Sequence, residues 1–170
     1  MMARLIIAAA CLCMLFGGAE LWAVDKIDDT REVVEAYNRA SWLLQTSDWA
    51  GASAQFRELI ARNPQSKNLD IFLYHAGRAD YHRGAYSEAA AAFEKLVGQF
   101  PESGLRAYGE HFLAGSHYAL ANVEGAIVSW FDAWRDAREE RLQKLIVSSL
   151  AGALNAASEV ELGRELFDRL

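Results

Sequence analysis

The chain has 170 residues, 52% of them hydrophobic, and its 17 basic residues stand against 23 acidic ones, a formal net charge of -6. This length fits one domain of ordinary size, and the acidic balance argues against nucleic-acid binding, which needs clustered Lys and Arg. Two prolines in the whole chain and Ala-rich stretches, such as residues 89–92, favour helix over strand. We therefore expect an all-α protein.

The first 23 residues have the pattern of a cleavable signal peptide. Arg4 gives a positive start, and residues 5–16 form an apolar run that is too short to span a bilayer comfortably. Cleavage after Ala23 is preferred, and cleavage after Ala19 is the alternative. An uncleaved anchor is disfavoured because Glu20 interrupts the apolar segment. We expect a periplasmic protein with no transmembrane span in the mature chain.

Both cysteines, Cys11 and Cys13, lie inside this apolar run. Removal of the signal peptide leaves a mature chain without cysteine, which excludes disulfides, zinc thiolates and cysteine nucleophiles. Small residues precede Cys11, as they do at a lipidation site. Only residues 5–7 would then remain as the apolar core ahead of the site, so we expect no lipid anchor.

From residue 33 onward the sequence repeats with a period of 37 residues. A small residue recurs at Ala52, Ala89, Ala126 and Gly163. An aromatic residue follows four positions later at Phe56, Phe93, Trp130 and Phe167. Three positions further on stand Leu59, Leu96, Ala133 and Leu170. These spacings place the three positions on one helical face, where the small residue allows a second helix to approach closely.

A second helix precedes each of these blocks, as residues 71–83 and 108–120 indicate, so each unit is predicted to be a helical hairpin. Asp29 with Glu32 and Ser158 with Glu161 have the spacing of capping boxes. Further N-caps are predicted between paired helices, at Asp48 and Asn122. A hairpin of this size cannot bury its apolar face alone, so successive hairpins must stack into a superhelix.

The repeat resembles the tetratricopeptide repeat family. The second unit carries the resemblance best, through Gly77, Tyr81, Gly84, Tyr86, Ala89, Phe93, Leu96 and Pro101. The family implies about 3.5 repeats here, in units 33–69, 70–106, 107–143 and an incomplete 144–170, within a repeat domain over residues 24–170. The sequence around Pro64 and Pro101, each followed two residues later by Ser, is similar to an envelope subgroup. That subgroup includes a periplasmic Tol-Pal-associated protein and a lipoprotein of outer-membrane protein assembly.

The resemblance implies a concave groove, lined by the first helix of each hairpin, that binds a partner protein or peptide. Carried over position by position, the groove residues are Tyr37, Tyr74, Arg78, Tyr81, His82, Tyr108, His111 and Tyr118. Side chains with an apolar body and a polar tip suit a partner's apolar side chains with a few directed hydrogen bonds. We expect part of this set to pack against neighbouring hairpins instead.

Two departures from the family pattern remain. Asp80 and His117 stand where a large apolar residue is usual. Either the frame shifts by one, so that Tyr81 and Tyr118 fill the core, or Asp80 and His117 form a partly buried pair that offsets their desolvation.

The second departure is the end of the sequence, which has no polar capping helix. Either a shortened last helix buries enough of itself, or the natural chain continues, or an apolar edge contacts a partner or a second copy. The edge residues are Leu162, Leu166, Phe167 and Leu170.

No catalytic motif occurs in the sequence, and we expect no enzyme activity, no metal and no cofactor. His75 and His82 share a helical face, but histidines without a carboxylate pattern are more often groove or surface residues. The sequence thus predicts a non-catalytic scaffold of the bacterial cell envelope. The alternatives are a homo-oligomerising assembly subunit, joined through the open last repeat, or an accessory domain of a peptidoglycan or secretion enzyme complex.

Overall fold

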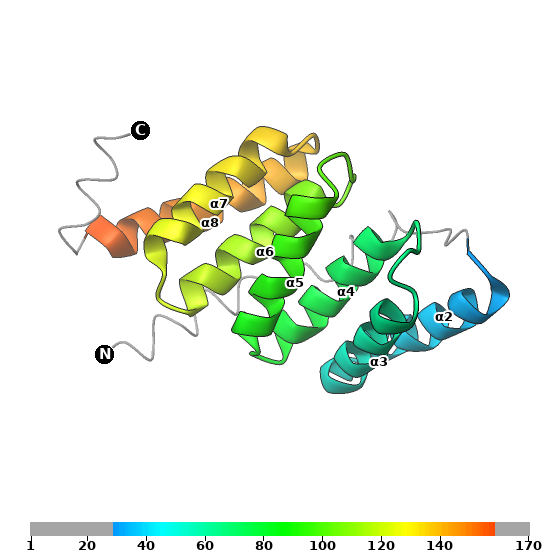
Figure 1. Cartoon of the computed structure of the whole chain (residues 1–170). Helices are drawn as coiled ribbons and strands as arrows, with labels where there is room; N and C mark the ends of the chain where they lie inside the picture. The colour runs from blue at the N-terminus through cyan, green and yellow to red at the C-terminus, as the bar shows by residue number, and fades with distance from the viewer. Residues whose placement is uncertain (1–28, 159–170) are drawn as a thin grey trace.

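The computed structural model describes residues 29–158, and these residues form antiparallel helices that stack as hairpins. No strand occurs among them. In chain order the helices are α2 (Arg31–Gln45), α3 (Trp49–Arg62), α4 (Leu69–His82), α5 (Tyr86–Gln99), α6 (Arg106–Ala119), α7 (Val123–Asp136) and α8 (Glu140–Ser158). Figure 1 shows the α2–α3 hairpin at one end of the array and α7 and α8 at the other. The all-α repeat fold is confirmed.

The turn inside each hairpin has the same backbone conformation. One residue with positive φ follows each first helix, namely Ser47 (60°), Gly84 (82°) and Ala121 (62°), so these residues are also 37 positions apart. The amide after each of them donates to a carbonyl five residues earlier, for example from Ala85 N to Asp80 O at 2.8 Å. Left-handed residues end helices in this way because they redirect the chain while satisfying terminal carbonyls.

The second helix of each described hairpin buries the side chains that the repeat predicts. Ala52, Ala89 and Ala126 are fully buried, and so are the aromatic rings of Phe56 and Phe93. The close approach of α4 and α5 also depends on a residue without a side chain, because a Cβ on Gly77 would lie 2.7 Å from Cζ of Phe93. The 37-residue spacing therefore corresponds to the packing interface within each hairpin.

The predicted caps are confirmed inside two hairpins and corrected at the start of the array. Asp48 accepts a hydrogen bond from the amide of Gly51, and Asn122 accepts one from Gly125. At α2 the N-cap is Thr30, whose hydroxyl accepts from Val33 N at 3.4 Å, so the proposed Asp29–Glu32 capping box is wrong. The proposed Ser158–Glu161 box lies partly outside the described residues, and Ser158 ends α8.

Asp29 instead takes part in the connection between the first two hairpins. Its carboxylate accepts from the Ser66 hydroxyl at 2.6 Å, and Ser66 itself accepts from the amide of Asn68. The next connection repeats this arrangement, with a 2.6 Å bond from Ser103 to Asp70. The serine that follows each proline thus ties the start of one hairpin to the hairpin before it.

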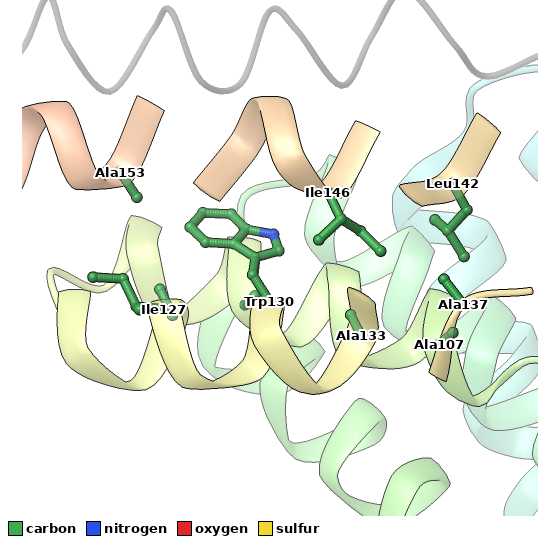
Figure 2. Packing of buried hydrophobic residues seen from close by; sticks show 10 residues of the cluster. Ala107, Ile127, Trp130, Ala133, Ala137, Leu142, Ile146 and Ala153 are labelled. Carbon is green, nitrogen blue, oxygen red and sulfur yellow. The ribbon is translucent and has the colours of Figure 1, made fainter. Parts of the chain in front are cut away.

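The junction between α7 and α8 is apolar. Ile127 and Trp130 of α7 contact the side of α8 that carries Ile146 and Ala153, as Figure 2 shows. Ile127 and Ile146 are almost completely buried. The junction therefore gains its stability from apolar area removed from water.

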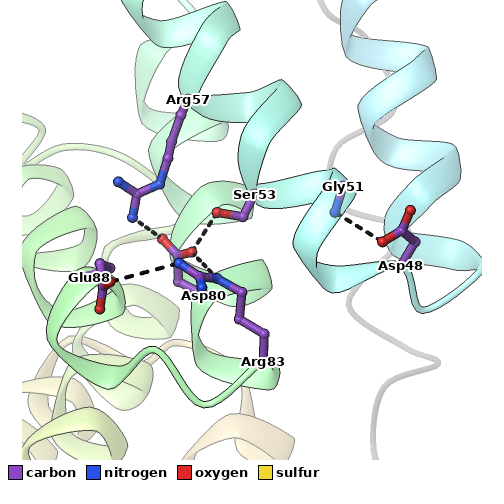
Figure 3. Close-up of polar contacts among 7 residues, drawn as sticks. All are labelled: Asp48, Gly51, Ser53, Arg57, Asp80, Arg83 and Glu88. Carbon is purple, nitrogen blue, oxygen red and sulfur yellow. Dashed lines mark hydrogen bonds and ion pairs between the residues drawn. The ribbon is translucent and has the colours of Figure 1, made fainter.

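The junction between α3 and α4 contains a buried polar cluster beside its apolar contacts (Figure 3). Asp80 of α4 is buried, and its carboxylate accepts from Ser53 Oγ at 2.5 Å and from Arg57 Nη2 at 2.6 Å, both on α3. Arg83 Nε donates to the same carboxylate at 2.8 Å. A buried carboxylate requires such partners because desolvation of an unpaired charge is costly.

The proposed pairing of Asp80 with His117 is wrong, because both Asp80 oxygens are used by Ser53 and the two arginines. His117 lies 3.9 Å from the Glu94 carboxylate instead. The expectation that Tyr81 fills the core holds, since Tyr81 is buried. Tyr118 is half-buried and packs against the core that contains Trp130.

Candidate partner-binding surface

All the predicted groove residues lie on the first helices of the hairpins, α2, α4 and α6. Tyr37, Tyr74 and His111 occupy the same position of successive first helices, because they are 37 residues apart. The other predicted residues lie on α4 and α6, within about three helical turns of Tyr74 and His111. The repeat therefore carries one stripe across three helices, and we call these eight residues the inner stripe.

The structure buries five residues of the inner stripe, and the other three are half-exposed. The buried ones are Tyr37, Tyr74, Arg78, Tyr81 and His111. The half-exposed ones are His82, Tyr108 and Tyr118. Most of the stripe thus packs within the stack, and the three half-exposed side chains are the ones that a partner can reach directly.

The buried aromatic residues join neighbouring hairpins. The Tyr74 ring meets the rings of Phe93, Tyr108 and Phe112 edge-on, with centroids 6.1 to 6.4 Å apart. Edge-to-face pairs at this distance stabilise packing beyond the area they bury. Tyr74 therefore links α4 to both α5 and α6, so a partner bound to the stripe would contact a rigid surface.

His75 lies beside the inner stripe, and the set of predicted groove residues did not include it. Its Nε2 lies 3.2 Å from the Tyr37 hydroxyl, and its ring stacks on Phe56 with centroids 5.3 Å apart. His75 directly follows Tyr74 in the sequence, and this position could have indicated a role beside the stripe, but the groove assignment did not include it. His75 therefore connects α2, α3 and α4 at one point.

Three histidines near the inner stripe are neutral at pH 7. Burial together with the nearby Arg78 charge lowers the pKa of His75 to about 3 and that of His82 to about 4, and burial lowers the pKa of His111 to about 4. Arg78 itself is buried with its guanidinium carbon 5.6 Å from the centre of the Tyr74 ring. The positive charge of this region at pH 7 therefore belongs to Arg78 rather than to the imidazoles.

The half-exposed residues of the stripe each have an aromatic or acidic neighbour. The His82 ring stacks on Trp49 with centroids 4.5 Å apart. Tyr108 donates a 2.7 Å hydrogen bond to Glu139, which precedes α8. These contacts hold the side chains in place, which lowers the conformational entropy that a partner's binding would cost.

Within residues 29–158, no group of three or more His, Cys, Asp or Glu side chains could hold a metal ion. No helix of that part of the chain is both long and apolar enough to cross a membrane. The predicted edge residues Leu162, Leu166, Phe167 and Leu170, the signal peptide and both cysteines lie outside the described residues.

Two relatives from Xylella fastidiosa are both named "Outer membrane protein assembly factor BamD". The chain is 26% identical over 88 residues to the one from strain 9a5c, which covers 52% of the chain and 30% of that relative. It is 27% identical over 74 residues to the one from strain Temecula1, which covers 44% of the chain and 25% of that relative. The chain therefore matches less than a third of each relative's length.

A protein family described as "YfiO: Outer membrane lipoprotein" matches residues 29–153. This range contains α2 to α7, the inner stripe and most of α8. On this match, which covers more than half of the sequence, the chain belongs to the YfiO outer membrane lipoprotein family.

Proposed function

We propose that this chain is a non-catalytic scaffold of the bacterial cell envelope, where it binds another protein or a peptide through the inner stripe and serves outer-membrane protein assembly. The observation that carries the proposal is the stripe itself, which repeats one position every 37 residues over three first helices. The names of both relatives support it, since they describe an outer membrane protein assembly factor, and the family description supports an envelope location, since it names an outer membrane lipoprotein.

Shape and aromatic contacts would provide the binding. Half-exposed His82, Tyr108 and Tyr118 supply apolar area together with polar tips, and the buried members of the stripe keep them in register. Tyr and other aromatic side chains often dominate binding energy at protein interfaces. The partner should therefore offer apolar side chains spaced along an extended or helical segment.

Crosslinking in intact cells tests this function. A photoreactive residue placed at Tyr108 or His82 should crosslink to an envelope protein, whereas one placed at exposed Lys95 of α5 should not. Mass spectrometry then identifies the crosslinked segment. If neither position crosslinks to a protein while the chain is folded and exported, the groove function is wrong.

The family description bears on the anchor of the chain. It names a lipoprotein, so it gives no support to the expectation that Cys11 lacks a lipid. The mass of the mature chain distinguishes the two processing routes. Cleavage after Ala19 or Ala23 leaves a chain without cysteine, whereas lipidation leaves a chain that begins at Cys11 and carries acyl groups.

A further inference from the structure

The first helix of the array differs from the other first helices at one register position. This position is held by Trp42, Ala79, Ser116 and Ala153, each 37 residues after the last. The three inner residues are small, and they are 0 to 2% exposed, whereas Trp42 is 61% exposed. The inner residues are small because a preceding hairpin packs on them, and Trp42 has no described hairpin before it.

The structure shows what covers this position in the second hairpin. Ala79 and Ala76 of α4 belong to one buried cluster with residues of α2 and α3. The neighbouring Asp80 is held by Ser53 and Arg57 of α3. An α-helix, α3, therefore occupies this side of α4, and α2 presents the corresponding side without a described helix on it.

That side of the first hairpin contains a cavity of about 740 Å³. We call it the N-terminal end face, and its lining residues are Asn38, Arg39, Trp42, Leu43, Gly51, Ala54 and Gln55. Gly51 has no side chain and Ala54 has a small one, so α3 leaves space beside the Trp42 ring. The end repeats of helical arrays ordinarily present a polar outer face, so an exposed tryptophan beside a hollow marks an interaction surface.

The charged residues on this face indicate which charge a bound partner would carry. Arg39 lies between the cavity and a second, more polar one of about 330 Å³ along the same helices. Arg31 and Arg62 nearby are paired with Glu35 and Glu58 at 2.8 and 2.7 Å. Arg39 makes no ion pair with any residue that the structure describes, so a carboxylate from a partner suits it.

We propose that the N-terminal end face binds an amphipathic α-helix of another protein, with a small side chain over Trp42 and a carboxylate at Arg39. A helix fits because α3 covers the corresponding side of α4, and helix surfaces pack by interdigitating rows of side chains. Trp and Arg are the side chains most enriched at the energetic centres of interfaces. A symmetric pairing of two copies through this face would bring the two Arg39 charges together, which disfavours a homodimer.

The test starts with a photoreactive residue at position 42 of the full-length chain in the cells that produce it. We expect a crosslink to a helical segment of another protein that carries Asp or Glu within one turn of the crosslinked residue. A crosslink to residues 1–28 of the same chain, to a second copy, or to no protein would overturn the proposal.

A synthetic peptide of the crosslinked segment then tests the two side chains on the purified chain. We expect Trp42→Ala and Arg39→Glu each to weaken its binding at least tenfold. Trp42→Ala should leave the melting temperature unchanged, because alanine occupies this register position in α4 and α8. Trp134→Ala is the matched control, since Trp134 is a similarly exposed tryptophan on α7 at the other end of the described array.

Equal binding of the peptide by the wild type and both variants would contradict the proposal. So would flotation with phosphatidylglycerol vesicles that is lost in Trp42→Ala, because the face would then bind a membrane surface instead. The groove function is tested separately at Tyr108 and His82, so either proposal can fail without the other.

Discussion

The junction between α3 and α4 and the junction between α7 and α8 use the same three register positions with opposite chemistry. Ser53, Arg57 and Asp80 occupy them in the first case, and Ile127, Phe131 and Leu154 in the second. At these positions the α3–α4 junction has a buried carboxylate held by hydrogen bonds and ion pairs, and the α7–α8 junction has side chains that pack in an apolar core. The repeat therefore specifies where two hairpins meet and leaves open which interaction holds them.

The two kinds of junction should respond differently to the same perturbations. An apolar contact loses stability with the area and volume removed from it. A buried ionic contact loses stability when one partner is left without the other, and replacing the whole group by apolar residues is often harmless. Three sets of variants test this difference and another set tests a second contrast, from the largest expected effect to the smallest.

The apolar junction should be the more sensitive to truncation. Ile127→Ala removes a side chain that is 1% exposed, and we expect it to lower the free energy of unfolding by about 3 kcal/mol. Urea denaturation followed by circular dichroism measures the change. Val128→Ala is the control, because Val128 is the exposed neighbour, and its effect should stay within about 0.5 kcal/mol. Equal losses in both variants would contradict the assignment of Ile127 to the core.

The polar junction should lose about 2 kcal/mol in Asp80→Leu, because Ser53 and two arginines lose a charged acceptor. The loss is limited because Arg57 and Arg83 are partly exposed and regain water. The triple variant Ser53→Ile, Arg57→Phe and Asp80→Leu installs the residues that the α7–α8 junction has at these positions. We expect the free energy of unfolding of this variant to lie within about 1 kcal/mol of the wild-type value. A triple variant less stable than Asp80→Leu would show that the junctions are not interchangeable.

His75 and Phe112 give a second contrast at one register position. The pKa of His75 is lowered from 6.5 to about 3, so between these pH values the unfolded chain binds a proton that the folded chain does not. Stability therefore falls as the pH decreases through this window, by about 1.4 kcal/mol per pH unit for this group. His75→Phe should reduce the slope of unfolding free energy against pH by that amount between pH 6 and 4.5. Tyr37→Phe, which removes only the hydroxyl beside His75, should keep the slope, and an unchanged slope in His75→Phe would refute the prediction.

The smallest effect is expected at the middle junction, where Glu94 and His117 hold the positions of Arg57 and Asp80. Their charged atoms lie 3.9 Å apart, and the Glu94 side chain is largely exposed. Exposed pairs contribute little because water screens them. Glu94→Ala should change the free energy of unfolding by less than about 0.5 kcal/mol in the same urea experiment, and a loss above 1 kcal/mol would mean that this pair is structural.

Much of the fold was predictable because its signals are local. The small and aromatic residues at Ala89 and Phe93 lie four positions apart, and the caps at Asp48 and Asn122 act within three residues. The failed capping box at Asp29 shows where local signals mislead. Thr30 competes for the same role, and Asp29 is recruited by Ser66, which is 37 residues away.

The candidate binding surface was predictable in position and not in exposure. The register placed Tyr74 and His111 correctly on the first helices. The burial of Tyr74 depends on the rings of Phe93 and Phe112, which approach from α5 and α6. Exposed Trp42 had no role in the sequence prediction, because its exposure depends on what packs beside α2, which the spacing of apolar residues alone does not give.

By itself the sequence determined the helical hairpins, their 37-residue register and the side chains inside each hairpin, since these follow from interactions over a few turns of helix. The tertiary structure decided what meets across hairpins, namely Ser53 and Arg57 at Asp80 and an aromatic network around Tyr74, and it decided that Trp42 is exposed at the end of the described array. The physical reason is that such contacts depend on how one hairpin is rotated on the next. Side chains 23 and 27 residues from Asp80 reach its carboxylate only in the stacked array.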